Sequence, residues 1–301
     1  MSKHTSKHLL SRRRFLQYLA ATGILGVTYM WQVEPRWLNL QEHDLPIATL
    51  PTAFDGLRIA QLSDFHIDPL YRYGYVQRVV ERVNALAPDV IFLTGDYVTQ
   101  DAAAAAPLAD VLVNLRAPFG TYAILGNHDV GHQRHVPVRN GLVQAGLPIL
   151  ENEHVPLTRD GQTLVVAGLA DGWHGRPDLP QALDAAPDAP VIVLLHEPDL
   201  VTRYQNEPRV IVQLSGHSHG GQIRVPGIGA VYLPRYGQQF DAGIYRVGNL
   251  WLNTNVGLGM TSYGITTPPV RFNCPPEISL LTLRRQTPNA GVKSRSSYIP
   301  V

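Results

Sequence analysis

Cysteine and charge are both scarce in this chain. Cys274 is the single cysteine among 301 residues, which excludes an internal disulfide and a cysteine-rich zinc fold. Charged residues make up 16% of the sequence, and the formal net charge is +1. Apolar residues make up 45%, which is typical of a folded globular protein and not of a disordered or collagen-like chain. A chain of this length can bury a substantial core and hold a rigid site within it.

The chain also lacks the basic surplus of a nucleic-acid-binding protein once its first 40 residues are set aside. Those residues contain six Lys and Arg side chains and one acid, Glu34. The other 19 basic side chains are outnumbered by 23 acidic ones, so the body is mildly acidic. This balance does not indicate a positive groove along a nucleic-acid backbone, and no nucleic-acid partner is expected.

The first 40 residues have the order of a bacterial export signal. Residues 11–16, Ser-Arg-Arg-Arg-Phe-Leu, resemble a twin-arginine signal, which implies the twin-arginine export machinery as a partner. The 19 uncharged residues from Phe15 to Val33 would extend about 28 Å as a helix, close to the hydrocarbon thickness of a bilayer. No Ala-x-Ala cleavage site follows them. Residues 1–40 are therefore interpreted as an export signal or an amino-terminal membrane anchor, with the body in the periplasm or on the extracytoplasmic face of the bacterial membrane.

From Leu57 the chain alternates short apolar runs with helical patterns, which is typical of an α/β fold with a buried sheet. A valine stripe at helical spacing predicts a helix over residues 75–87, and Pro88 ends it. Strands are predicted at 57–63, 90–94, 121–125, 163–169, 191–195 and 210–214.

After Gly220 the helical periodicity weakens, and short apolar runs alternate with Gly and Pro turns. Strands are predicted there at 222–225, 230–233, 243–247 and 277–283. This pattern predicts a second, largely antiparallel sheet that packs on the first. The polar residues 284–301 are expected to form a mobile carboxyl-terminal tail.

Five of the predicted strands end in residue types that bind metals: Asp64 and His66, Asp96, Asn127 and His128, His196, and His217 and His219. A single Asp or His in such a place is usually a turn former or a satisfied polar group. Five together indicate one site, because ligands of α/β sheets bind outside the carboxyl ends of the strands. Carboxylate, imidazole and amide donors without a thiolate suit Mn²⁺, Fe or Zn²⁺.

The blocks DxH, GD, GNHD, H and GHSH follow one another from Asp64 to His219, and in this order they resemble the calcineurin-like metallophosphoesterase superfamily. Residues 216–223 and the proline-containing segments of residues 257–283 look like its exported YkuE/YaeI-type phosphodiesterase branch and lipid-A-precursor pyrophosphatases. The resemblance implies a four-layer αββα sandwich of two mixed sheets, with residues 41–283 as the metallophosphoesterase domain. It also implies two divalent metal ions, Mn, Fe or Zn.

The same resemblance implies a role for each matching residue. The first-metal ligands correspond to Asp64, His66 and His219, the bridging carboxylate to Asp96, and the second-metal ligands to Asn127, His196 and His217. His128 matches the residue beside the reacting phosphate, and Asp129 is expected to orient it. A hydroxide shared by the two ions is the expected nucleophile, since coordination lowers the pKa of water toward roughly 7.

These features predict a phosphoester hydrolase of the bacterial envelope that cleaves a phosphodiester or pyrophosphate, with a lipid or cell-wall precursor as candidate substrate. A phosphomonoesterase stays open, because both ester classes use the same metal core. A non-catalytic envelope binding protein with this fold is a further alternative. Residues 216–220 also fit the Gly-x-Ser-x-Gly motif of a serine hydrolase, but no histidine follows His219. Trp173 and Tyr232 are more simply interpreted as loop and turn residues than as parts of the site.

Overall fold

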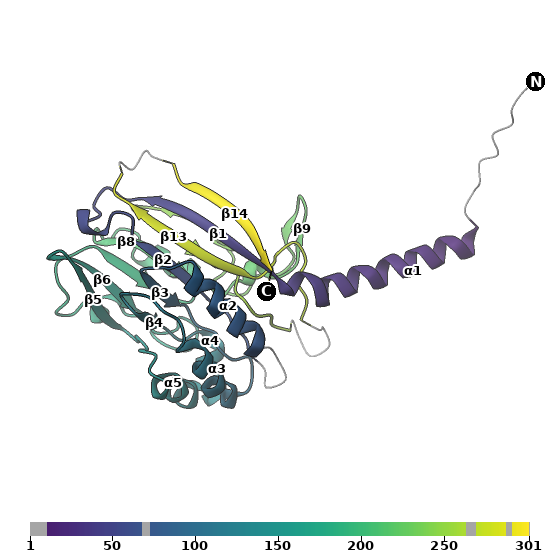
Figure 1. Cartoon of the computed structure of the whole chain (residues 1–301), viewed down its shortest axis with the longest axis horizontal. Helices are drawn as coiled ribbons and strands as arrows, with labels where there is room; N and C mark the ends of the chain where they lie inside the picture. Colours follow the sequence, from purple (N-terminus) through teal and green to yellow (C-terminus); the bar gives the residue numbers. More distant parts are fainter. Residues whose placement is uncertain (1–10, 68–72, 263–268, 287–290, 301) are drawn as a thin grey trace, which may run out of the picture.

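The computed structural model describes residues 11–67, 73–262, 269–286 and 291–300. Within them, two six-stranded sheets face each other, and helices lie on the outer sides (Figure 1). Both sheets contain parallel and antiparallel strand pairs, so the predicted sandwich of two mixed sheets is confirmed.

The first sheet has the strand order β14-β1-β13-β2-β3-β4. Its strands are β1 (Trp37–Pro46), β2 (Arg58–Leu62), β3 (Val90–Leu93), β4 (Thr121–Ala123), β13 (Glu277–Arg284) and β14 (Lys293–Pro300). The three strands β2, β3 and β4 run parallel to one another. Their carboxyl ends therefore meet at one edge of the sheet.

The second sheet has the strand order β11-β12-β8-β7-β6-β5. Its strands are β5 (Glu153–Arg159), β6 (Gln162–Gly168), β7 (Val191–Leu194), β8 (Val210–Ser215), β11 (Gly243–Val247) and β12 (Leu250–Thr254). The four central strands are parallel, and only the two edge strands run antiparallel to their neighbours. A separate two-stranded ribbon is formed by β9 (Arg224–Val225) and β10 (Gly229–Ala230).

Buried apolar side chains form three layers, one between the two sheets and one on the outer face of each sheet. The helices α2 (Tyr73–Ala85), α3 (Ala105–Leu112) and α5 (His135–Gln144) pack on the outer face of the first sheet, beside the short helix α4 (Asn127–Val130) (Figure 1). A second cluster lies between the two sheets. The outer face of the second sheet is covered by the single turn α6 (Leu179–Ala182) and the 3-10 segment η6 (Pro198–Arg203). The fourth layer is thus present but thin.

The helix predicted over residues 75–87 is α2, which ends two residues earlier, at Ala85. Its valines at positions 76, 79, 80 and 83 are all buried, because their spacing places them on one face against the first sheet. The spacing of apolar residues alone was therefore sufficient to predict this helix.

The carboxyl-terminal third does not form its own antiparallel sheet, so that part of the prediction is wrong. β13 inserts between β1 and β2 of the first sheet, whereas β11 and β12 complete the second sheet beside β8. The expectation of a mobile tail after residue 283 also differs from the structure, because β14 pairs antiparallel with β1. Its polar side chains suit an exposed edge strand, which needs backbone hydrogen bonds rather than burial.

The amino-terminal segment contains a long exposed helix, α1 (Arg12–Thr28), which continues through a π-helical turn, η1 (Tyr29–Val33), to the body. No helix among the described residues is long and apolar enough to cross a membrane. The body begins before residue 40, because Glu34 is buried and accepts a hydrogen bond from the Cys274 amide at 2.6 Å.

A cavity in the apolar layer between the two sheets should destabilise the fold. Leu281 on β13 is fully buried in this layer, so Leu281→Ala should lower the free energy of unfolding by about 2–5 kcal/mol. The control Val113→Ala removes a side chain that is 48% exposed and should change it by less than about 0.5 kcal/mol. Urea unfolding of both variants measures the difference, and equal losses would contradict this packing.

Candidate metal centre

Seven side chains from both sheets converge at the carboxyl ends of the strands. Each follows a strand directly or after a tight turn: Asp64 and His66 after β2, Asp96 after β3, Asn127 after β4, His196 after β7, and His217 and His219 after β8. Because β2 to β4 are parallel, as are β7 and β8, these ends reach the same edge of the sandwich. The structure thus brings together all seven residues that the sequence proposed as metal ligands.

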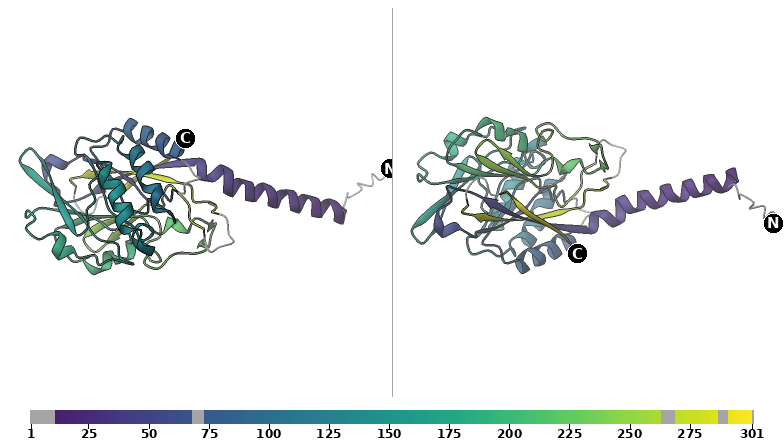
Figure 2. Two further views of the ribbon diagram at one scale, coloured as in Figure 1. Left: turned by 90° about the horizontal axis from the view of Figure 1, so that it is seen from below. Right: turned by 90° about the horizontal axis from the view of Figure 1, so that it is seen from above.

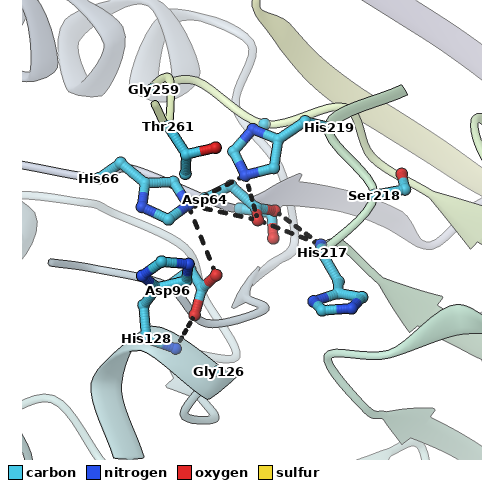
Figure 3. Close-up of polar contacts among 12 residues, drawn as sticks. Asp64, His66, Asp96, Gly126, His128, His217, Ser218, His219, Gly259 and Thr261 are labelled. Carbon is cyan, nitrogen blue, oxygen red and sulfur yellow. Dashed lines mark hydrogen bonds and ion pairs between the residues drawn. The ribbon is translucent and has the colours of Figure 1, made fainter. Parts of the chain in front are cut away.

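The first group of donors comprises Asp64, His66, Asp96 and His219, whose ligand atoms all lie within 4.8 Å of one another. His219 Nε2 is 3.2 Å from Asp64 Oδ1, and His66 Nε2 is 3.4 Å from Asp96 Oδ2. The two Nε2 atoms of His66 and His219 are 3.0 Å apart. Figure 3 shows both imidazoles directed toward the carboxylates.

The second group comprises Asp96, His196 and His217, again within 4.8 Å. His196 Nε2 is 3.1 Å from Asp96 Oδ2, and Asn127 Oδ1 lies 2.8 Å from His217 Nδ1. Asp96 belongs to both groups. A carboxylate shared in this way is suited to bridge two cations.

The donor atoms fit a pair of metal ions. His196 is fully buried and its Nδ1 donates to the Thr94 carbonyl at 2.6 Å, which leaves Nε2 as the nitrogen whose lone pair can bind a metal. That Nε2 atom has no hydrogen-bond partner. A cation satisfies such a lone pair, and oxygen and imidazole donors without a thiolate accept Mn²⁺, Fe or Zn²⁺. The site is a dinuclear metal-binding site, as predicted, and the donors leave the identity of the metal open.

The backbone of the metal-binding residues is strained. Asp64, His66, Asp96, His217 and His219 have φ between 46° and 71°, in the left-handed region that non-glycine residues rarely adopt. Such conformations persist only where the surrounding structure enforces them, and they concentrate at functional sites. The strain here coincides with five of the seven ligand residues.

Gly126 is required by close packing at the bridging carboxylate. A Cβ at this position would overlap Asp96 Oδ1 and would lie 2.7 Å from the Asp96 amide nitrogen. Gly216 has a similar place beside Asp64, where a Cβ would overlap Ser63 Oγ and Asp64 Oδ2. Gly126 and Gly216 are therefore required for space rather than for a positive φ.

His128 lies at the edge of the metal site and is oriented by a backbone carbonyl. Its Nδ1 is 3.2 Å from the Thr99 carbonyl oxygen, and its amide donates to Asp96 Oδ1 at 2.9 Å. The ring is nearly perpendicular to that of His66, with centroids 4.9 Å apart. Because Nδ1 is hydrogen-bonded to the Thr99 carbonyl, Nε2 remains available to contact a bound substrate.

Asp129 does not have the predicted role of orienting His128. Its carboxylate is buried and accepts hydrogen bonds from the four backbone amides of Asp96, Tyr97, Val98 and Gly126, at 2.8–3.2 Å. The side chain therefore holds the Asp96 loop against the start of α4. It positions the bridging carboxylate instead of the histidine.

The buried charges shift one another's pKa values. Burial opposes ionisation of Asp64, but the neighbouring histidines, His219 first, hold its pKa well below the usual range. Burial also disfavours protonated His66, yet hydrogen bonds to Asp64 and Asp96 raise its pKa to about 9. Burial lowers the pKa of His217 and of His219 to about 4. The last two imidazoles are thus neutral at pH 7 and ready to bind a metal.

A pocket of about 330 Å³ opens over the metal site. It is lined by Asp96, Asn127, His128, Trp173, His217, Ser218, His219, Tyr232, Pro234, Thr261 and Ser262. Trp173 and Tyr232, interpreted from the sequence as loop and turn residues, are therefore walls of the pocket. The loop of Trp173 follows β6, which runs parallel to β7, so the same strand-end rule would have identified it.

Ser218 does not have the environment of a hydrolase nucleophile. Its hydroxyl donates to the Asp241 carbonyl at 2.5 Å and accepts from the Gly220 amide at 3.1 Å. Both partners are backbone groups rather than a histidine. The geometry therefore disfavours the serine-hydrolase alternative.

Two cation sites that share a buried carboxylate, with a histidine beside the open pocket, define the class of dinuclear metallohydrolases. The family model of the calcineurin-like phosphoesterases matches residues 57–221, and the chain belongs to this family. It is accordingly a metal-dependent phosphoric ester hydrolase.

Two curated relatives are similar over nearly the whole chain, and a third over two thirds of it. YkuE, a metallophosphoesterase of Bacillus subtilis, is 35% identical over 91% of this chain and 98% of its own length. The phosphodiesterase YaeI of Escherichia coli is 33% identical over 91% of this chain and 100% of its own. The UDP-2,3-diacylglucosamine pyrophosphatase LpxG of Chlamydia trachomatis is 28% identical over 66% and 75%. Among solved structures, the NAD nucleotidase of Haemophilus influenzae matches with a TM-score of 0.46 at 14% identity, over 68% of this chain and 46% of that one.

The packing of Gly126 against Asp96 predicts that Gly126→Ala weakens metal binding by roughly 10- to 100-fold, because the bridging carboxylate must move. Titration calorimetry with Mn²⁺ measures the affinity. Gly74→Ala is the matched control, since a Cβ there would meet only the end of the Arg78 side chain at 3.9 Å. Unchanged affinity in Gly126→Ala would contradict the assignment of Asp96 as a ligand.

The raised pKa of His66 predicts that metal binding releases a proton. In the metal-free protein this imidazole is protonated below about pH 9, and a metal binds only its neutral form. Proton release from His66 should therefore be full at pH 7 and decline as the pH rises through 9. Calorimetry in two buffers with different ionisation enthalpies measures the released protons. Identical heats in both buffers at pH 7 would refute the prediction.

Proposed function

We propose that the protein hydrolyses a phosphodiester or pyrophosphate bond in a lipid or cell-wall precursor. The observation that carries the choice is the composition of the pocket. None of the lining side chains that the structure describes is Lys or Arg, while Trp173 and Tyr232 supply aromatic walls. A phosphomonoester carries two charges and needs extra cationic partners, whereas a diester carries one charge and a second substituent that needs room.

The chain's own groups have distinct tasks in this reaction. When bound, the two cations supply Lewis acidity that activates water and neutralises the phosphoryl oxygens. Asp96 holds the two cation sites together, and Asp129 fixes the loop of Asp96 through backbone amides. His128, held by Thr99, lies where Nε2 can give a proton to the leaving oxygen. The negative charge of a bound phosphate favours the protonated form of that imidazole.

The proposed location is the extracytoplasmic face of the bacterial membrane, in the periplasm or bound to the membrane. Three arginines, Arg12 to Arg14, precede the uncharged stretch from Phe15 to Val33, which supports recognition by the twin-arginine export machinery. The name of LpxG, a pyrophosphatase of a diacylated sugar nucleotide, supports a lipid precursor as the substrate class. Manganese, iron and zinc all suit the donor set.

His128→Ala tests the catalytic assignment. We expect hydrolysis of bis-p-nitrophenyl phosphate by the metal-loaded protein to fall roughly 100- to 10,000-fold, because proton donation to the leaving group is lost. Chelation with EDTA should abolish the activity. His132→Ala is the matched control, because His132 is exposed.

Metal content is measured in parallel by mass spectrometry. If His128→Ala kept both metals and full activity, the catalytic role of His128 would be refuted. Faster hydrolysis of p-nitrophenyl phosphate than of the diester would favour the phosphomonoesterase. Failure of the metal-loaded wild-type chain to hydrolyse any phosphoester would favour a binding protein.

A further inference from the structure

Exposed large apolar side chains are concentrated at one end of the molecule. In the helical segment and the residues after it they are Phe15, Leu16, Tyr18, Leu19, Ile24, Leu25, Val27, Trp31, Val33 and Trp37. In the β9–β10 ribbon and the residues after it they are Ile228, Val231 and Tyr232, which are 78%, 64% and 53% exposed. Figures 1 and 2 show the ribbon at the end of the body from which α1 projects.

Contacts join the base of α1 to the ribbon. Tyr29, Trp37, Pro226 and Tyr298 line one small cavity, which places the end of the helix, the start of β1, the ribbon and β14 side by side. The rings of Trp37 and Tyr298 are 5.0 Å apart. The helix end is also tied to the body, because the Arg271 amide donates to the Met30 carbonyl at 2.9 Å. The end of the helix therefore lies beside the ribbon and is fixed to the body.

Lipid is the partner that fits this surface. No residue of α1 is buried, so its exposed apolar side chains, among them Leu19 and Ile24, favour a nonpolar partner outside the chain. The helix begins with three arginines, and aromatic residues, among them Trp31 and Trp37, lie at its junction with the body. Tryptophan and tyrosine at the edge of an apolar segment are typical of the membrane interface.

The charge of the ribbon also suits a membrane surface. Residues 222–236 contain no Asp or Glu and include Arg224 and Arg235. Arg224 is paired with Asp241 at 2.6 Å, whereas Arg235 is exposed. An exposed apolar tip with a basic and no acidic neighbour in its segment favours contact with lipid headgroups.

We propose that the turn of the ribbon, at Ile228, together with Val231 just after β10, docks on a lipid bilayer and thereby places the mouth of the active-site pocket at the membrane surface. The chain continues from β10 through Val231 to Tyr232 and Pro234 in the wall of the pocket. Substrate carried by lipid would reach the metals without leaving the bilayer. The benefit for a lipid substrate rests on the proposed function, but the docking itself does not.

A fluorescent label at the ribbon tip tests the docking. Ile228→Cys in the full chain is labelled with the environment-sensitive dye NBD, and Cys274 is 4% exposed and shielded from labelling. Vesicles of phosphatidylcholine and phosphatidylglycerol should shift the emission to the blue, and spin-labelled lipid should quench it. The matched control is Val136→Cys on α5, a site that is 61% exposed and distant from α1 in Figure 1. An Ile228→Cys signal no different from the control would overturn the proposal.

A second variant separates docking from catalysis. Ile228→Asp should lower hydrolysis of a fluorogenic lipid phosphodiester in vesicles by about tenfold, because an apolar contact with the bilayer is replaced by a charge. Its hydrolysis of soluble bis-p-nitrophenyl phosphate should equal that of the wild type, and Val136→Asp should change neither rate. If Ile228→Asp hydrolysed both the lipid substrate and the soluble substrate at the wild-type rate, docking would be contradicted. If the wild type hydrolysed neither substrate, the proposed function would be refuted, whereas the fluorescence test of docking would still hold.

Discussion

The whole site depends on the burial of two carboxylates, Asp64 and Asp96, close to one another and away from water. Like charges in such a place are costly unless cations lie between them. In the metal-free chain, protonated imidazoles such as His66 supply the opposing charge, at a pKa raised to about 9. Divalent metals would replace these protons and would be held by ligands from both sheets. The same two carboxylates therefore hold the ligand loops of both sheets together and provide ligands for the metal ions.

The two sheets must be held in fixed relation for this arrangement to persist. Between them lies an apolar layer, together with a buried polar connection through Gln61 on β2. Gln61 donates to the Ser215 carbonyl at 2.8 Å and accepts from Asn253 at 2.7 Å, so it joins the two sheets just before the ligand loops begin. The strained φ angles of the ligand residues are maintained by this rigid support.

Much of the site could be predicted from the sequence, because each ligand lies directly after an apolar run and the run itself determines where the strand ends. The partners of each strand could not be predicted in the same way. β13 resembles the other carboxyl-terminal strands locally but pairs in the first sheet, and β14 is a polar edge strand without an apolar signal. Pairing is a long-range property of the packed sheets. The role of Asp129 could not be predicted for a similar reason, since most of its amide partners, at residues 96–98, are distant in the sequence.

The most direct test of the central claim is a crystal structure of the metal-loaded protein with anomalous scattering recorded at the metal edge. The account predicts two peaks about 3.5–4 Å apart. One should lie between Asp64, His66 and His219, the other between Asn127, His196 and His217, with Asp96 touching both. A single peak, or metal bound away from Asp96, would contradict the account.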